Sequence, residues 1–335
     1  MINFFPPVLA ILVACCGVII TSAVNSCLDL NTGRCTFESS HDLELGWSCD
    51  ITDDDVVAGD LKACFEHFGE NNIHGLYMSG NPLTTLPAGT FDSLQAMTLL
   101  YLGYNDLAVL PAGMFGSLPA LTRLDMTTNH LTTLPAGMFG SLPALTELDV
   151  TYNALATLPA GIFGSLPALA ELDLSFNQLA TLPAGMFGSD NQLTTMDLSY
   201  NSLSTLPVGV FDHLILLIDL DLSDNYLVTL PAGMFDSGNQ LIYINLGYNH
   251  LTTLPAGIFD SLPAMTSLEL RDNDLMMLPA GIFDSLPNLI DLSINSNSLT
   301  TLPAGIFESL EALETLDLSD NTDLECLPTL PSTDM

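Results

Sequence analysis

One period of 24 residues runs through most of the chain. Phenylalanine keeps this step from position 91 to 307, glycine from 89 to 305, and a Leu-Pro pair begins at each such step from 86 to 302. Four columns locked to one period indicate stacked copies of a single structural unit, because such periodicity is the signature of a repeat architecture. The fourth column is asparagine, at Asn81, Asn105, Asn129, Asn153, Asn177, Asn201, Asn225, Asn249, Asn273, Asn297 and Asn321.

Each unit reads L-x-x-L-x-L-x-x-N-x-L-x-x-L-P-x-G-x-F-x-x-L-x-x. The alternation around Leu148 and Val150 predicts a short strand with one buried side. Asn153 then ends the strand. Its side chain is expected to bond backbone groups of the turn and of the next coil, because unpaired buried backbone groups are costly.

The second half of the unit predicts an irregular return path. Pro135 removes a backbone donor and fixes φ, so this segment is expected to leave the hydrogen-bond ladder. Gly137 permits a tight backbone. Phe139 and Leu142 are expected to point inward, where stacked coils merge them into one apolar spine. Because no coil can bury that surface alone, about three or more repeats are needed for stability.

This pattern resembles the leucine-rich repeat family, in its 24-residue typical extracellular subclass. The phrase "LPAGxFxSLPALxxLDLSxN" is similar to variable lymphocyte receptors and, more loosely, to Toll-like receptor and Slit ectodomains, over residues 73–327. The resemblance implies an α/β-type solenoid dominated by β-structure. In such a horseshoe a parallel sheet lines the concave side, mostly irregular coils form the convex side, and a ligand is held on the concave face.

We divide the chain into a secretory signal peptide at 1–26, a cysteine-containing N-terminal cap at 27–72, a solenoid of about eleven repeats at 73–327 and a short tail at 328–335. The first 26 residues carry no charged side chain, and cleavage is predicted near Ala23. This predicts a secreted, extracellular protein. The apolar run from Val8 to Ile20 is marginal for spanning a membrane, so an uncleaved N-terminal anchor is the alternative.

Cysteine usage also favours an oxidising compartment. Four cysteines precede the first repeat and allow three pairings, of which we favour Cys27 with Cys35 and Cys49 with Cys64, because nearest neighbours close short loops. No C-x-x-C pair occurs, which argues against zinc. Cys326 is left over by this count. It is buried, links two chains into an oligomer, or marks a truncated gene product.

The chain is strongly acidic, with 39 Asp and Glu against four Lys and Arg and a formal net charge of −35. Nucleic acid is therefore not an expected partner, since binding it requires a positive surface. The acidity suits a basic ligand, and it also keeps an apolar repeat soluble, which is the plainer explanation.

The repeat leaves free the strand positions six, four, two and one before each Asn, which are expected to face the concave surface. Seven of the eight tyrosines stand at such positions. The predicted ligand-binding residues are Tyr101, Tyr104, Glu147, Asp149, Tyr152, Glu171, Asp173, Phe176, Asp197, Tyr200, Asp219, Asp221, Tyr243 and Tyr248.

The position four before Asn holds aspartate in five consecutive repeats, from 125 to 221. Neighbouring coils should bring these carboxylates about 4.8 Å apart. At that spacing they are expected to repel one another, which raises their pKa values or draws in cations. Rigid aromatic side chains beside them supply contact area at small entropic cost, and acids steer a basic ligand. Alternatively, these aspartates belong to the ordinary repeat pattern and are merely solvated.

No motif for catalysis, a cofactor or a metal is found, so the chain is predicted not to be an enzyme. The sequence predicts a secreted or cell-surface recognition module that binds a protein, peptide or glycan. A membrane partner is expected only if the signal is uncleaved. The alternative is a matrix or surface-adsorbing solenoid, similar to ice-binding solenoids, that uses a threonine file at Thr85, Thr133, Thr157, Thr181, Thr205, Thr229, Thr253 and Thr301.

Overall fold

The computed structural model describes residues 33–39, 45–51 and 73–324, apart from 117 and 238–239. The predicted signal peptide, Cys27, Cys64, Cys326 and the tail at 328–335 lie outside these residues. So does much of the predicted cap.

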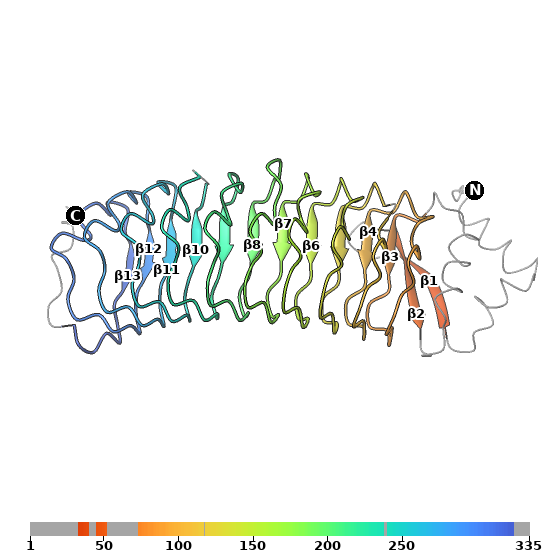
Figure 1. Ribbon diagram of the computed structural model, residues 1–335, viewed down its shortest axis with the longest axis horizontal. Helices are drawn as coiled ribbons and strands as arrows, with labels where there is room; N and C mark the ends of the chain where they lie inside the picture. The colour runs from red at the N-terminus through yellow and green to blue at the C-terminus, as the bar shows by residue number, and fades with distance from the viewer. Residues whose placement is uncertain (1–32, 40–44, 52–72, 117, 238–239, 325–335) are drawn as a thin grey trace, which may run out of the picture.

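The described residues form one elongated solenoid whose strands all join a single 13-stranded sheet in sequence order (Figure 1). Two seven-residue strands, β1 (Gly33–Ser39) and β2 (Leu45–Ile51), pair antiparallel at the N-terminal end. Eleven three-residue strands follow and pair in parallel: β3 (Gly75–Tyr77), β4 (Leu99–Tyr101), β5 (Arg123–Asp125), β6 (Glu147–Asp149), β7 (Glu171–Asp173), β8 (Thr195–Asp197), β9 (Asp219–Asp221), β10 (Tyr243–Asn245), β11 (Ser267–Glu269), β12 (Asp291–Ser293) and β13 (Thr315–Asp317).

The N-terminal hairpin extends the sheet instead of forming a separate unit. Its strand β2 pairs in parallel with β3, through Trp47 opposite Leu76. Within the hairpin the backbone register places Cys35 opposite Cys49. A Cys35–Cys49 disulfide belongs to one of the three pairings that the sequence allows. The favoured pairing, Cys27 with Cys35 and Cys49 with Cys64, stays a prediction.

In most of the parallel strands only the middle residue is buried, as in β6 and β7. Leu148 lies between Glu147 and Asp149, whose side chains are partly exposed, and Val150 is again buried. This confirms the predicted alternation. The chain then turns away, and the strand bounds recur at 24-residue intervals with the pairing in perfect register.

The asparagine column forms a ladder of side-chain hydrogen bonds along the solenoid. Asn177 accepts a bond from the Leu155 amide at 3.1 Å and donates to the carbonyls of Val150, Leu174 and Ser175 at 3.0, 3.1 and 3.2 Å. Leu155 and Val150 belong to the preceding coil, so the expected bond to the next coil is wrong in direction. Each asparagine side chain bonds to its own turn and to the coil that precedes it in the sequence.

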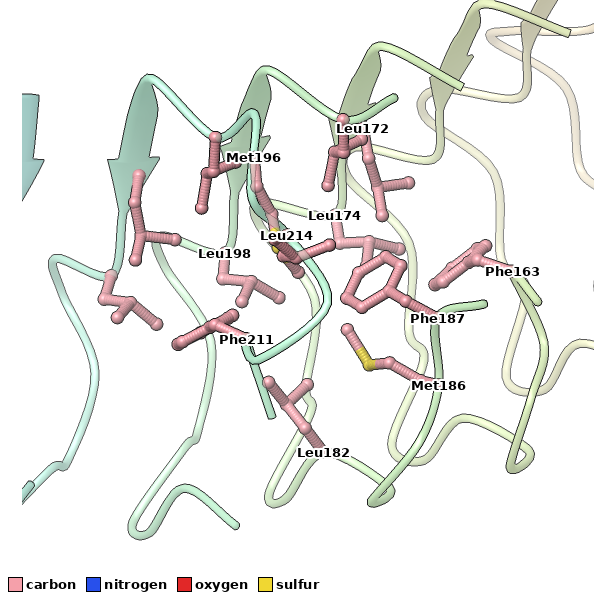
Figure 2. Packing of buried hydrophobic residues seen from close by; sticks show 14 of the residues in the cluster. Phe163, Leu172, Leu174, Leu182, Met186, Phe187, Met196, Leu198, Phe211 and Leu214 are labelled. Carbon is pink, nitrogen blue, oxygen red and sulfur yellow. The ribbon is translucent and has the colours of Figure 1, made fainter. Parts of the chain in front are cut away.

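The predicted phenylalanine spine is the centre of the core. Phe139 is fully buried, and its ring centroid lies 6.3 Å from that of Phe115 and 6.1 Å from that of Phe163. Figure 2 shows Phe163 and Phe187 in the core together with Leu172 of β7 and Leu174, which follows that strand. Gly137 has φ of 71°, a left-handed value that glycine adopts without strain, as the sequence predicted.

Ring spacings show which side of the sheet is concave. On the outward face of the sheet, Tyr77 and Tyr101 stack 4.8 Å apart, whereas rings of the phenylalanine spine lie 5.7–6.4 Å apart. Coils that are more widely spaced behind the sheet than in front of it must curve with the sheet on the inner side. No helix in the described part of the chain has the length and apolar character needed to cross a membrane.

Candidate ligand-binding surface

Two grooves occur where the sequence predicted one surface. The first, which we call the strand-face groove, lies over β5 to β8 and has a volume of about 230 Å³. Carboxylates line it because the positions six and four before Asn point outward from every strand. Its lining residues are Arg123, Leu124, Glu147, Leu148, Asp149, Glu171, Leu172, Asp173, Thr195 and Asp197.

The aspartates of the strand-face groove also terminate their strands. The Oδ1 atom of Asp173 accepts a hydrogen bond from the backbone amide of Ser175 at 2.9 Å, and Asp197 accepts one from Ser199 at 2.7 Å. Asn245 holds the same place in β10, accepting from the Gly247 amide at 3.0 Å. One carboxylate oxygen of these residues therefore has a structural role, which agrees with the alternative that the aspartates belong to the ordinary repeat pattern. Asparagine can fill that role, as Asn245 shows.

Burial raises the pKa of carboxyl groups in this column more than repulsion does. Desolvation is the largest cause at Asp149, and at Asp197 it raises the pKa to about 6. Neighbouring aspartates raise the pKa of both carboxyls further, as a smaller cause than desolvation. The expected direction is confirmed at these two groups, but the expected cause is not the main one. For these two carboxyls, the loss of hydration between stacked coils raises the pKa more than the charge of neighbouring aspartates does.

Part of the acidic surface is neutralised at its N-terminal end. The Arg123 Nη1 atom lies 2.7 Å from Glu147 Oε2, and its guanidinium lies 5.6 Å from the ring centroid of Tyr101. Tyr101 in turn stacks on Tyr77 at 4.8 Å. Glu147 and Tyr101 therefore contact other side chains of the chain itself, and the acids of the groove without an ion pair among the described residues, Asp149, Glu171, Asp173 and Asp197, lie over β6, β7 and β8.

The second groove, which we call the edge groove, is larger, at about 710 Å³. It runs beside the asparagine ladder, where the chain has already left the strand. One wall consists of residues one before each Asn and the other of residues one after it. The lining residues are Tyr152, Asn153, Phe176, Asn177, Gln178, Tyr200, Asn201, Asp224, Asn225, Tyr226, Tyr248, Asn249, His250 and Asp272.

An aromatic stack forms part of the first wall. The Phe176 ring lies 4.1 Å from the rings of both Tyr152 and Tyr200, with interplanar angles of 15° and 8°. Tyr152 is 53% exposed and Tyr200 is 48% exposed. The rings cover one another's faces and present their edges to the groove.

The aromatic residues occupy a strained backbone position. Ten non-glycine residues of this column, among them Tyr152, Phe176 and Tyr200, have φ between 49° and 56°. A left-handed conformation costs an ordinary L-residue about 1 kcal/mol, and only Gly, Asn and Asp adopt it readily. Large apolar side chains at such sites need a reason beyond the fold, and strain of this kind concentrates at functional sites.

The structure divides the predicted residues. Five of them, Tyr101, Tyr104, Asp219, Asp221 and Tyr243, line neither groove. Burial is the largest cause that raises the pKa of Asp219, and it also raises the pKa of Tyr243 to about 12. Among the residues described, no group of three or more His, Cys, Asp or Glu is placed to hold a metal ion.

Sequence reasoning missed the second wall of the edge groove and two acids of the first. Tyr226 and His250 stack with centroids 6.0 Å apart, and His250 Nδ1 lies 3.2 Å from Asp274 Oδ2. Asp224 and Asp272 belong to the same column as the aromatic stack. The second wall could have been found from the position one after each Asn, because it repeats every 24 residues like the strand positions chosen as candidates.

The Asp197→Asn variant is expected to be more stable than the wild type near pH 7. The folded-state pKa of about 6 exceeds the unfolded value of 3.8, so the folded state holds the extra proton between these values. That stabilisation is complete below about pH 4 and is lost as the pH rises through about 6. The gain from asparagine should therefore shrink as the pH falls from about 7 to 4, measured by melting temperature.

Asp317 offers a matched control at the same position of β13. Hydrogen bonds from the Ser319 hydroxyl and amide lower its pKa, so its ionised form is favoured by folding. Its contribution is present above the unfolded pKa and lost as the pH falls. Asp317→Asn should not stabilise the protein at neutral pH. A stability gain for Asp197→Asn that does not change with pH would contradict the burial argument.

A solenoid of short parallel strands with an asparagine ladder and an open inner face defines a class of repeat scaffold that binds by surface and not by an enclosed cavity. Within that class the chain belongs to the leucine-rich repeat family, whose sequence profile matches residues 71–131, 121–179, 167–227, 215–275 and 263–322. No curated protein matches the sequence.

Solved structures of the same fold are similar over most of the solenoid. A chain in the Toll–Spatzle complex of Drosophila is 29% identical, with a TM-score of 0.72 over 80% of this chain and 35% of that one. A leucine-rich repeat protein of Leptospira interrogans is 29% identical, with a TM-score of 0.65 over 76% and 65%. A chain in the LRIM1/APL1C complex is 26% identical, with a TM-score of 0.62 over 79% and 48%. The chain thus spans about a third to two thirds of their lengths.

Proposed function

We propose that this protein is a secreted or cell-surface recognition module, without enzymatic activity, that binds a protein, peptide or glycan along its concave side. The observation that carries the proposal is the aromatic stack of Tyr152, Phe176 and Tyr200, held at positive φ, in which the two tyrosines are half-exposed. The fold needs no aromatic ring there, since Thr128 and Ser296 adopt the same backbone conformation. Exposed aromatic anchors are typical of binding surfaces.

The two grooves are expected to contribute to binding in different ways. The edge groove offers rigid aromatic contact area, which stabilises a bound partner. The strand-face groove offers carboxylates, which accelerate the approach of a basic partner from a distance. The net charge of −35 supports a preference for basic ligands.

The relatives support a protein partner. Two of the similar structures are complexes, Toll with Spatzle and LRIM1 with APL1C. The predicted signal peptide and cysteine-containing cap support an extracellular location, in residues outside the described part of the chain. The uncleaved anchor remains the alternative for a cell-surface form.

We expect the triple variant Tyr152→Asn, Phe176→Asn, Tyr200→Asn to fold normally and to lose its ligand. Asparagine relieves the backbone strain at all three sites and so offsets the loss of stacking. In the experiment, the purified wild type is used to capture its ligand from the native extracellular fluid, and the bound ligand is eluted with salt. The variant should capture at least about 10-fold less of the same species, because loss of buried anchors raises the off-rate.

Two further variants make the capture experiment decisive. Val208→Ser removes an exposed apolar side chain outside both grooves and should capture as well as the wild type. Asp149→Asn, Asp173→Asn, Asp197→Asn should instead slow association, and added salt should erase that difference because the screening length is about 8 Å at physiological ionic strength. Equal capture by the aromatic variant and the wild type would place the binding site elsewhere.

A second candidate function uses the threonine file. All eight threonines four residues after Asn are exposed, on a surface that neither groove includes. A regular file of hydroxyl and methyl groups supports adsorption to an ordered surface such as ice. Thermal hysteresis of the purified protein tests this, and its absence would leave recognition as the proposal.

A further inference from the structure

The aromatic wall of the edge groove is interrupted at one repeat, where an aspartate replaces the aromatic side chain. In successive repeats the column holds Tyr152, Phe176, Tyr200, Asp224 and Tyr248. The first three rings stack at 4.1 Å. Asp224 stands where a fourth ring would continue the stack, and Tyr248 follows it. The carboxylate therefore lies between two tyrosines.

The backbone is unchanged across this interruption. Tyr200, Asp224 and Tyr248 have φ of 52°, 53° and 53°. Their amides donate to the next coil at 3.1, 3.1 and 3.0 Å. With the same coil spacing, two steps of 4.1 Å place the ring positions of Tyr200 and Tyr248 about 8 Å apart. This gap has the thickness of one planar group, the thickness that Phe176 fills between its own neighbours.

The chemistry of the gap selects a cation. Asp224 lines the groove between the two tyrosines, and Asp272 lines the same groove one coil beyond Tyr248. The Asp224 carboxylate accepts a hydrogen bond from the Tyr200 hydroxyl, and the charge of Arg271 also acts on it, as a smaller effect. One hydrogen bond leaves further acceptor sites on the carboxylate. The faces of two tyrosine rings are negative and attract a cation within about 6 Å. A guanidinium is both planar and cationic, whereas an ammonium is not planar.

The chain itself shows this contact twice. Arg123 and Arg271 are the only Lys or Arg residues whose side chains the structure describes, and both guanidinium groups lie over tyrosine rings. Arg271 lies 5.1 Å from the ring centroid of Tyr248. It comes from the coil that follows Tyr248, whereas Asp224 comes from the coil before it.

We propose that the gap between Tyr200 and Tyr248, which Asp224 lines, binds an arginine side chain of a partner protein. The guanidinium inserts between the two rings and pairs with the carboxylate. The proposal refines the recognition function and names one side chain of its ligand. The tyrosines are half-exposed, at 48% and 44%, so the gap is open to a side chain from solution.

The test uses a small probe and needs no native ligand. N-acetyl-arginine amide is titrated into the full chain and followed by NMR. We expect saturable binding, with the side-chain methylene protons of the probe shifted upfield by the tyrosine rings. N-acetyl-citrulline amide has the same planar shape without charge, and N-acetyl-lysine amide has the charge without the planar group. Both should bind at least about fivefold more weakly than the arginine probe.

Two substitutions at the same position separate charge from space. Asp224→Asn removes the charge and should weaken the arginine probe about fivefold. Asp224→Tyr fills the interruption with an aromatic side chain and should abolish binding. Asp320→Asn is the matched control, because Asp320 has the same left-handed backbone but lies outside the edge groove. It should bind the probe as the wild type does.

Equal affinity for the arginine and citrulline probes, or unchanged binding by Asp224→Tyr, would overturn the proposal. Both Asp224 variants are checked for a cooperative melt. If one fails to fold, the other and the three-probe comparison still decide the question. Capture of the native ligand that depends on the aromatic stack but not on Asp224 would refute the arginine site and leave the recognition function standing.

Discussion

Replacing Phe139 by alanine is expected to lower the free energy of unfolding by about 3–5 kcal/mol, the usual cost of truncating a fully buried phenylalanine. The ring is wholly buried between those of Phe115 and Phe163, at 6.3 and 6.1 Å. Alanine would leave a cavity that two flanking coils cannot close, because each is held by its own neighbours. Urea unfolding followed by circular dichroism measures the change.

The matched control is a phenylalanine outside the core. Phe176 stacks on Tyr152 and Tyr200 at the surface, so Phe176→Ala should cost about 1 kcal/mol or less. The same substitution therefore distinguishes the two roles of one residue type. Similar losses at both sites would mean that the spine is not the main source of stability.

Replacing Asn177 by leucine should destabilise the protein by about 1–3 kcal/mol, the second largest effect we expect. Its side chain makes four hydrogen bonds and is buried. The Leu155 amide would lose its acceptor, whereas the Ser175 carbonyl keeps its bond from the Tyr152 amide. The cost therefore comes mainly from one orphaned amide, which a leucine side chain cannot satisfy.

Gln178→Leu is the control for that experiment. Gln178 is exposed and adjoins Asn177, so the change should alter stability by no more than about 0.5 kcal/mol. Thermal and urea unfolding of the two variants can be compared directly. An Asn177 variant as stable as the Gln178 variant would show that the ladder bonds contribute little.

The core could be predicted residue by residue because burial follows a local rule. Leu148, Val150, Phe139 and Leu142 are all buried as the repeat predicted. Gly137 is left-handed, as a tight return path requires. Each of these outcomes depends on positions within one coil, and the 24-residue period repeats them.

The site could be predicted only as a set of columns. The strained φ of Tyr152 and Phe176 has no sequence signature, because glycine occupies that column only at Gly80. The second wall, with Tyr226 and His250, comes from residues on the far side of the ladder. Its position relative to the aromatic stack depends on how the chain turns at each asparagine.

The sequence by itself determined the stacking of coils, the buried spine and the position of the asparagine column, because each follows from a periodic pattern of apolar and polar residues. The parallel sheet was implied by the resemblance to the leucine-rich repeat family, and the direction of the asparagine bonds came only from the structure. Only the tertiary structure decided that the aromatic and acidic columns line separate grooves. It also decided that burial raises the pKa of Asp197 to about 6, and that Asp224 and Tyr248 line the same groove as the aromatic stack. These features depend on distances between side chains 24 or 48 positions apart and on the water excluded between them, which periodicity alone does not specify.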